Sequence, residues 1–129
     1  MNLAFKKQLL LICLLVLVSC AKKLQLSDQE RLNIKIQIAR LSDVPMPFGC
    51  EPVLDYINEH SFGYLIKDSD RLDLLQYYLV ELDQYGWNLI GQFEGLEQNL
   101  IFEKPHKLLS IIIRKQEHKY FVLLLSKNK

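Results

Sequence analysis

The stretch that decides the fold is residues 108–126, which read LLSIIIRKQEHKYFVLLLS. Two runs rich in strand-forming residues flank the polar connection from Gln116 to Lys119, a pattern typical of two antiparallel strands. Successive side chains of a strand point to opposite faces, and in both runs the two alternating sets are apolar. A helix packed on one side of such a sheet buries only one face. The second apolar face therefore needs the N-terminal segment, a partner protein or another copy of the chain to cover it.

Two further strand patterns precede this pair, at residues 87–93 and 98–104. The connections between the four segments contain Gly95, Pro105 and His106, residue types that favour turns. The sequence therefore predicts a β-meander over residues 87–126.

One amphipathic helix is expected before the meander. Its apolar face follows a 3-4-3 spacing, widened by two tyrosines, and consists of Leu72, Leu75, Tyr78, Leu79, Leu82 and Tyr85. Asp68-Ser69-Asp70 supplies an N-cap candidate, and Gly86 ends the helix. An antiparallel sheet packed on one main amphipathic helix makes the predicted fold class α+β.

The residues before this helix favour extended structure. Segments 53–57 and 62–67 predict a hairpin, and Pro45 and Pro47 exclude a helix there. Ser27 and Glu30 match a capping box, which marks the start of a helix. The apolar residues between 32 and 38 alternate with polar ones, however, and this period predicts a turn followed by an extended segment.

The first twenty residues, MNLAFKKQLLLICLLVLVSC, have the pattern of a lipoprotein signal peptide. Lys6 and Lys7 precede an apolar run at 9–18, which is shorter than the ~20 residues that a membrane-spanning helix needs. An uncleaved transmembrane anchor is the alternative, and it would place the two lysines in hydrocarbon. Cleavage between Ser19 and Cys20 would leave Cys20 to carry diacylglycerol and an N-acyl chain such as palmitate, a stable anchor.

This pattern predicts three parts: a signal peptide at 1–19, a lipidated cysteine with its spacer at 20–42, and one domain at 43–129. Because Cys13 leaves with the signal, Cys50 is the only other cysteine of the mature chain, and we expect a small buried residue rather than a disulfide. Ala21 after Cys20 favours the outer membrane, facing the periplasm.

The near-neutral net charge hides a separation along the chain. Residues 43–103 hold twelve acids and two bases, whereas residues 104–129 hold seven bases and one acid. We expect the two parts to neutralise each other within one fold. A basic face that meets anionic lipid or a partner is the alternative.

Several motifs resemble a family of small, largely uncharacterised bacterial lipoproteins. They are the opening Asp-Val-Pro-Met-Pro at 43–47, the pair Tyr77-Tyr78 within the amphipathic helix, and Gly86-Trp87 at its end. The resemblance covers most of the mature chain and implies the fold and the envelope location, without a chemical activity.

No catalytic or metal motif stands out. His60, His106 and His118 each lie alone in an expected turn, without the spacing of metal ligands. Acids at 68, 70 and 73 resemble a cation site, although acids at a helix N-terminus serve capping and the helix dipole. Trp87 and the nearby tyrosines are expected mainly in the core. No nucleophile and base recur together, so a hydrolase is the least favoured class, and we expect no enzyme, no cofactor and no nucleic-acid partner.

The sequence therefore predicts a lipid-anchored envelope lipoprotein that binds or assembles with another protein, or with further copies of itself. The candidate interaction residues are Tyr77, Phe121, Leu123 and Leu125. The alternative is a protein that binds a small ligand or lipid in a pocket between helix and sheet.

Overall fold

The structure, a computed structural model, describes residues 26–68 and 73–129. The chain divides into two units, residues 1–32 and 33–129. The α+β prediction is confirmed, since the described residues contain two α-helices and a six-stranded antiparallel sheet. The predicted signal peptide, with Ser19 and Cys20, lies outside the described residues.

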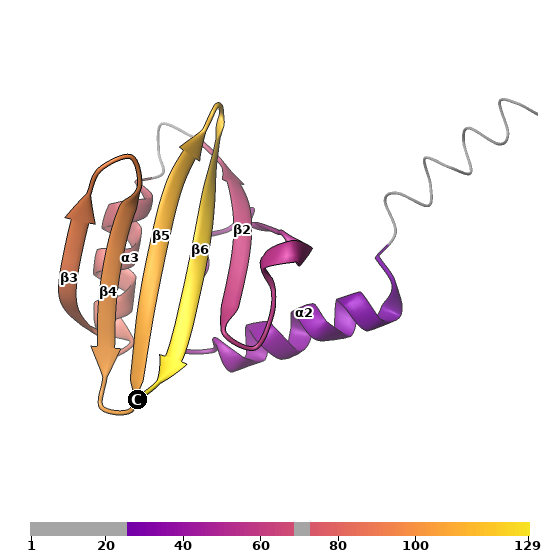
Figure 1. Cartoon of the computed structure of the whole chain (residues 1–129), viewed down its shortest axis with the longest axis horizontal. Helices are drawn as coiled ribbons and strands as arrows, with labels where there is room; N and C mark the ends of the chain where they lie inside the picture. Colours follow the sequence, from indigo (N-terminus) through magenta and orange to yellow (C-terminus); the bar gives the residue numbers. More distant parts are fainter. Residues whose placement is uncertain (1–25, 69–72) are drawn as a thin grey trace, which may run out of the picture. The chain divides into compact units, whose positions relative to one another are not determined.

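The strands lie in the order β1-β2-β6-β5-β4-β3, and every neighbouring pair is antiparallel. Figure 1 shows β3, β4, β5, β6 and β2 side by side. The predicted meander is confirmed, with strand ends shifted by one or two residues. The bounds are β1 (Glu51–Pro52), β2 (Ser61–Lys67), β3 (Asn88–Glu94), β4 (Gln98–Lys104), β5 (Lys107–Gln116) and β6 (Lys119–Asn128).

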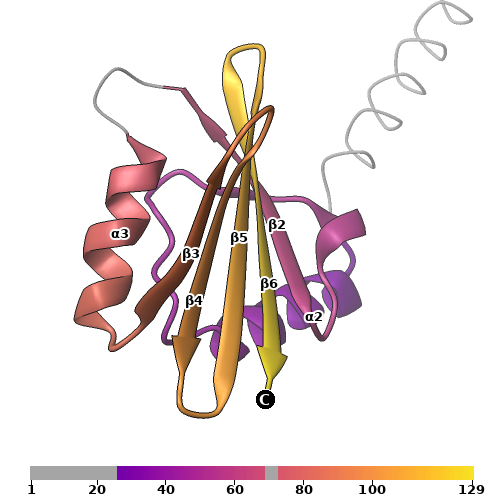
Figure 2. The ribbon, with the colours of Figure 1, turned by 60° about the vertical axis from the view of Figure 1, so that its left-hand side comes forward.

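Helix α3 (Leu74–Gln84) packs against one face of this sheet, as Figure 2 shows from the side. Its N-cap is Asp73, whose carboxylate accepts a hydrogen bond from the backbone N–H of Gln76 at 3.2 Å. The N-cap is therefore later in the chain than the predicted Asp68-Ser69-Asp70. Gly86, at φ 84°, ends it as predicted, because this left-handed conformation suits glycine.

The core lies between α3 and the sheet face that we call the core face. Leu74, Tyr78 and Leu82 supply the buried side of α3, while Tyr85 is 46% exposed and does not join it. The strand residues of the core face have exposures of 5% or less. They are Phe62, Tyr64, Ile66, Leu100, Phe102, Leu109, Ile111, Ile113, Val122 and Leu124.

The extended segment predicted over residues 32–38 is wrong, because helix α2 spans Asp28–Arg40. The capping box is present, since the Ser27 and Glu30 side chains each accept from the other residue's backbone N–H. In residues 33–129, Ile34, Gln37 and Leu41 recur at helical spacing, and all three pack inward. This 3-4 spacing prevails over the two-residue alternation of the isoleucines.

The strand predicted over residues 53–57 is also wrong. β1 has only two residues, and the chain then forms a short 3-10 helix, η1 (Leu54–Tyr56). The cause is tertiary: Tyr56 packs on Gly63 of β2 and meets the Phe121 ring edge-on, with ring centroids 4.9 Å apart.

Candidate functional site

The outer face of the sheet is the face turned away from α3, and it remains apolar. The strand register places on it Leu65 of β2, Phe121, Leu123 and Leu125 of β6, Leu108 and Ile112 of β5, and Ile101 of β4. All seven side chains are half-buried, whereas each has at least one sequence neighbour on the core face that is buried. Cross-strand partners such as Leu123 and Ile112 lie directly opposite each other and form one continuous patch.

η1 covers one corner of the outer face, over β2. A Cβ atom at Gly63 would lie 2.6 Å from the Cβ of Tyr56, so only glycine permits this close contact. Ser61 holds the same turn, because its hydroxyl donates to the backbone carbonyl of Tyr56 at 2.9 Å. Tyr56 is itself 46% exposed, so this cover is partial.

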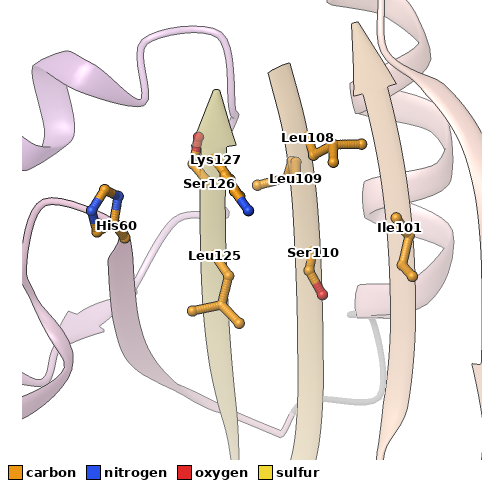
Figure 3. A pocket seen from close by; sticks show the side chains of 8 residues that line it. All are labelled: His60, Ile101, Leu108, Leu109, Ser110, Leu125, Ser126 and Lys127. Atoms are coloured by element: carbon orange, nitrogen blue, oxygen red, sulfur yellow. The ribbon is translucent and has the colours of Figure 1, made fainter. Parts of the chain in front are cut away.

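The outer face is hollowed near the end of β6, and we call this depression the outer hollow. It has a volume of about 420 Å³. Figure 3 shows its lining side chains on β4, β5 and β6, with His60 beside β6 from the loop before β2. The lining residues are His60, Ile101, Leu108, Leu109, Ser110, Leu125, Ser126 and Lys127.

A second depression, the helix-side hollow, lies between the last turns of α2 and the end of β6. Its volume is about 670 Å³, and it is lined by Ile36, Gln37, Arg40, Glu59, His60, Lys107, Ser126, Lys127 and Asn128. Gln37 is 6% exposed, and its Oε1 has no hydrogen-bond partner among the described residues. An unpaired buried amide oxygen is costly, which marks this position as unusual.

The predicted pocket between helix and sheet has a partial counterpart. Under the middle of α3 the space is filled by side chains such as Tyr78 and Leu82, which are fully buried. A hollow of about 440 Å³ occurs at the first turn of α3, and its lining is Asp73, Leu74, Leu75, Gly95, Leu96, Gln98, Ile113, Lys115 and Tyr120.

The predicted interaction residues do not all come together. Phe121, Leu123 and Leu125 share the outer face, as their two-residue spacing requires. Tyr77 lies on α3, on the opposite side of the sheet, where it packs edge-on against Tyr78 at 5.1 Å between ring centroids. Sequence reasoning missed Ile101 and Tyr56, because only the strand order and the η1 turn bring them to the outer face.

The charge separation of the sequence is resolved by ion pairs within the fold. All six ion pairs between described residues join an acid from 43–103 to a base from 104–129. Their partners are Lys104 and Lys107 with Asp43, Arg114 with Glu97, Lys115 with Asp68, Lys119 with Glu51, and Lys129 with Glu103. Six of the seven bases in residues 104–129 therefore have an acidic partner within the fold.

Asp43, in the proline-rich opening, is the most connected of these acids. Its carboxylate accepts from Lys104 Nζ at 3.1 Å and Lys107 Nζ at 3.4 Å, and its carbonyl accepts from Trp87 Nε1 at 2.9 Å. Partial burial alone would raise the pKa of Asp43, but the hydrogen bonds and charges of the two lysines outweigh it and hold the pKa below its ordinary value. These contacts hold Asp43 against Lys104 of β4 and Lys107 of β5.

A hydrogen bond between two buried tyrosines joins α3 to β2 within the core. The hydroxyls of Tyr64 and Tyr78 hydrogen-bond to each other, and burial raises the pKa of both phenols far above its ordinary value. Both tyrosines therefore remain neutral, and the hydrogen bond between them has a structural role.

Cys50 is half-buried rather than fully buried, and its thiol donates to the Pro47 carbonyl at 2.6 Å.

The histidines lie in turns, as predicted, and all three are exposed. Among the described residues, no three His, Cys, Asp or Glu side chains come close enough to hold a metal ion. Within the same residues, neither α2 nor α3 has the length and apolar character needed to cross a membrane.

Comparison with protein-family models, with curated proteins and with solved structures gives no match to this chain. The lipoprotein resemblance therefore stays a prediction from the quoted motifs.

Proposed function

We propose that this chain is a non-enzymatic binding protein of the bacterial envelope, anchored by lipid on Cys20, and that the outer face of its sheet is the binding surface. The single observation that supports this is the apolar patch around Leu123, over which no described element packs apart from η1. Patches of this kind on monomeric proteins are commonly interaction sites.

The composition of the patch favours a protein occupant over a polar ligand. Its centre combines Phe121, Leu123 and Ile112 on adjacent strands, with Tyr56 at the border. Interfaces typically place aliphatic and aromatic side chains at the centre and charges at the rim, and Arg114 and Lys127 continue the same face at its two ends. The occupant is a second copy of the chain or another envelope protein with a complementary apolar surface.

The absence of an enzymatic role belongs to the same proposal. Ser61 Oγ donates to a backbone carbonyl, and the Cys50 thiol does the same. Among the described residues, neither nucleophile is hydrogen-bonded to a base, the arrangement that activates such groups.

The test uses the full chain produced in a Gram-negative host. A photo-crosslinking residue replaces Leu123 on the outer face, and a matched variant carries it at Val80, which is 45% exposed on α3. We expect adducts from position 123 and few from position 80, with an adduct of twice the mass indicating a second copy. The same cells receive alkyne-tagged palmitate, and the label should vanish in Cys20→Ser because the acceptor sulfur is lost.

Leu123→Lys should abolish the adducts formed from a crosslinker at Ile112, because a charge then occupies the centre of the patch. Equal crosslinking from positions 123 and 80 would contradict the binding surface. Palmitate label that persists in Cys20→Ser would contradict the anchor, whatever the crosslinks show.

A further inference from the structure

The two hollows meet at the end of β6. His60, Ser126 and Lys127 line both of them. Beyond Leu125, which pairs with Ser61, β6 is no longer paired with β2, and the Ser126 N–H donates instead to the His60 carbonyl at 2.9 Å. His60, in the loop before β2, thus lines both hollows. Lys127 lies where the apolar lining of the outer hollow meets the polar lining of the helix-side hollow.

The outer hollow has an apolar floor. Ile101, Leu108 and Leu125 supply it, and the other lining residues are His60, Leu109, Ser110, Ser126 and Lys127. Figure 3 shows these side chains gathered at one end of the sheet. Its volume of about 420 Å³ falls within the range of roughly 300–1,000 Å³ that small-molecule sites occupy.

The helix-side hollow has a basic lining. Arg40, Lys107 and Lys127 line it together with one acid, Glu59. Lys107 is already paired with Asp43, and Arg40 donates to the Asn58 carbonyl at 3.3 Å. Within the described residues, no carboxylate lies within 4.0 Å of Arg40 or Lys127. These two cations are therefore left for an external anion.

We propose that the end of β6 binds one long-chain carboxylate of the fatty-acid class, with its chain in the outer hollow and its carboxylate against Lys127. An apolar depression bordered by an uncompensated cation matches an apolar chain that ends in an anion. Arg40 adds attraction from the helix-side hollow. The volume of the outer hollow favours a single chain over a two-chain lipid. This site goes beyond the proposed function, because it requires no partner protein.

The test uses the full chain in phosphatidylcholine vesicles, which carry no net charge. A palmitate bearing a diazirine is added and activated by light, and mass spectrometry locates the attached label. We expect the label on β5 and β6, around Leu108 and Leu125. Unlabelled palmitate should compete with the diazirine analogue for this site.

Lys127→Gln removes the cation, and Lys119→Gln is its matched control. Both lysines lie on the same face of β6, at opposite ends of the strand. We expect labelling to fall about tenfold in Lys127→Gln and to stay unchanged in Lys119→Gln. Ser110→Phe, which fills the outer hollow, should also abolish labelling; circular dichroism checks that each variant is folded.

Three outcomes would overturn the proposal. Labelling that is the same in Lys127→Gln and Lys119→Gln would show that the cation has no role. Hexadecanol competing as well as palmitate would show that the site binds any long apolar chain and does not recognise the carboxylate. Competition by phosphatidylglycerol equal to that by palmitate would assign the cation to a membrane headgroup.

Discussion

The two faces of β5 and β6 are built from similar residues and have different surroundings. On the core face, Ile111 and Leu124 are 0% exposed within the core cluster. On the outer face, their neighbours Ile112 and Leu123 lie directly opposite each other and remain half-buried. Apolar composition alone therefore does not bury a strand face. Burial requires a second layer, and the described part of the chain supplies one for the core face and only the η1 corner for the outer face.

The largest expected effect comes from comparing adjacent isoleucines on β5. Ile111→Ala should lower the free energy of unfolding by about 3 kcal/mol, because it leaves a cavity in a packed core. Ile112→Ala should cost about 1 kcal/mol or less, since solvent fills the space. Urea unfolding of the two variants measures the difference. Equal costs would mean that the outer face is as thoroughly covered as the core face.

A smaller effect is expected at the two tyrosines whose hydrogen bond joins α3 to β2. Tyr64→Phe should cost about 2 kcal/mol, because it leaves the hydroxyl of Tyr78 buried without a partner. The double variant with Tyr78→Phe should cost less than the sum of the two single variants, since neither hydroxyl is then orphaned. A double-mutant cycle of unfolding free energies gives the coupling. Strict additivity would exclude an energetically significant bond.

The smallest effect is expected at Asp43, at the border of the sheet. Asp43→Asn should cost about 1 kcal/mol at neutral pH, because it weakens the contacts with Lys104 and Lys107. The folded-state pKa of Asp43 is depressed, so its contribution is complete above the ordinary value of about 4 and is lost as the pH falls through the lower, folded value. The gap between wild type and variant should therefore close in acid. A gap that stays constant down to about pH 2 would contradict an ionic origin.

Local patterns were sufficient for part of this fold. The four strands of the meander, the end of α3 at Gly86 and the position of the histidines in turns all follow from short-range chemistry. The strand predicted over residues 53–57 failed for a tertiary reason, and the extended segment predicted over residues 32–38 failed because two local signals competed. At Asp28–Arg40 the Ser27–Glu30 capping box indicated a helix, and the alternating isoleucines indicated a strand.

The sequence by itself determined that both faces of residues 108–126 are apolar, because side-chain alternation is a property of any strand. Only the tertiary structure decided which face is buried, that Tyr77 lies across the sheet from Leu123, and that Lys127 borders an apolar hollow. The physical reason is range: periodicity depends on neighbouring residues, whereas burial depends on which distant surfaces meet. On the outer face, η1 covers one corner, and no other described element forms a second layer.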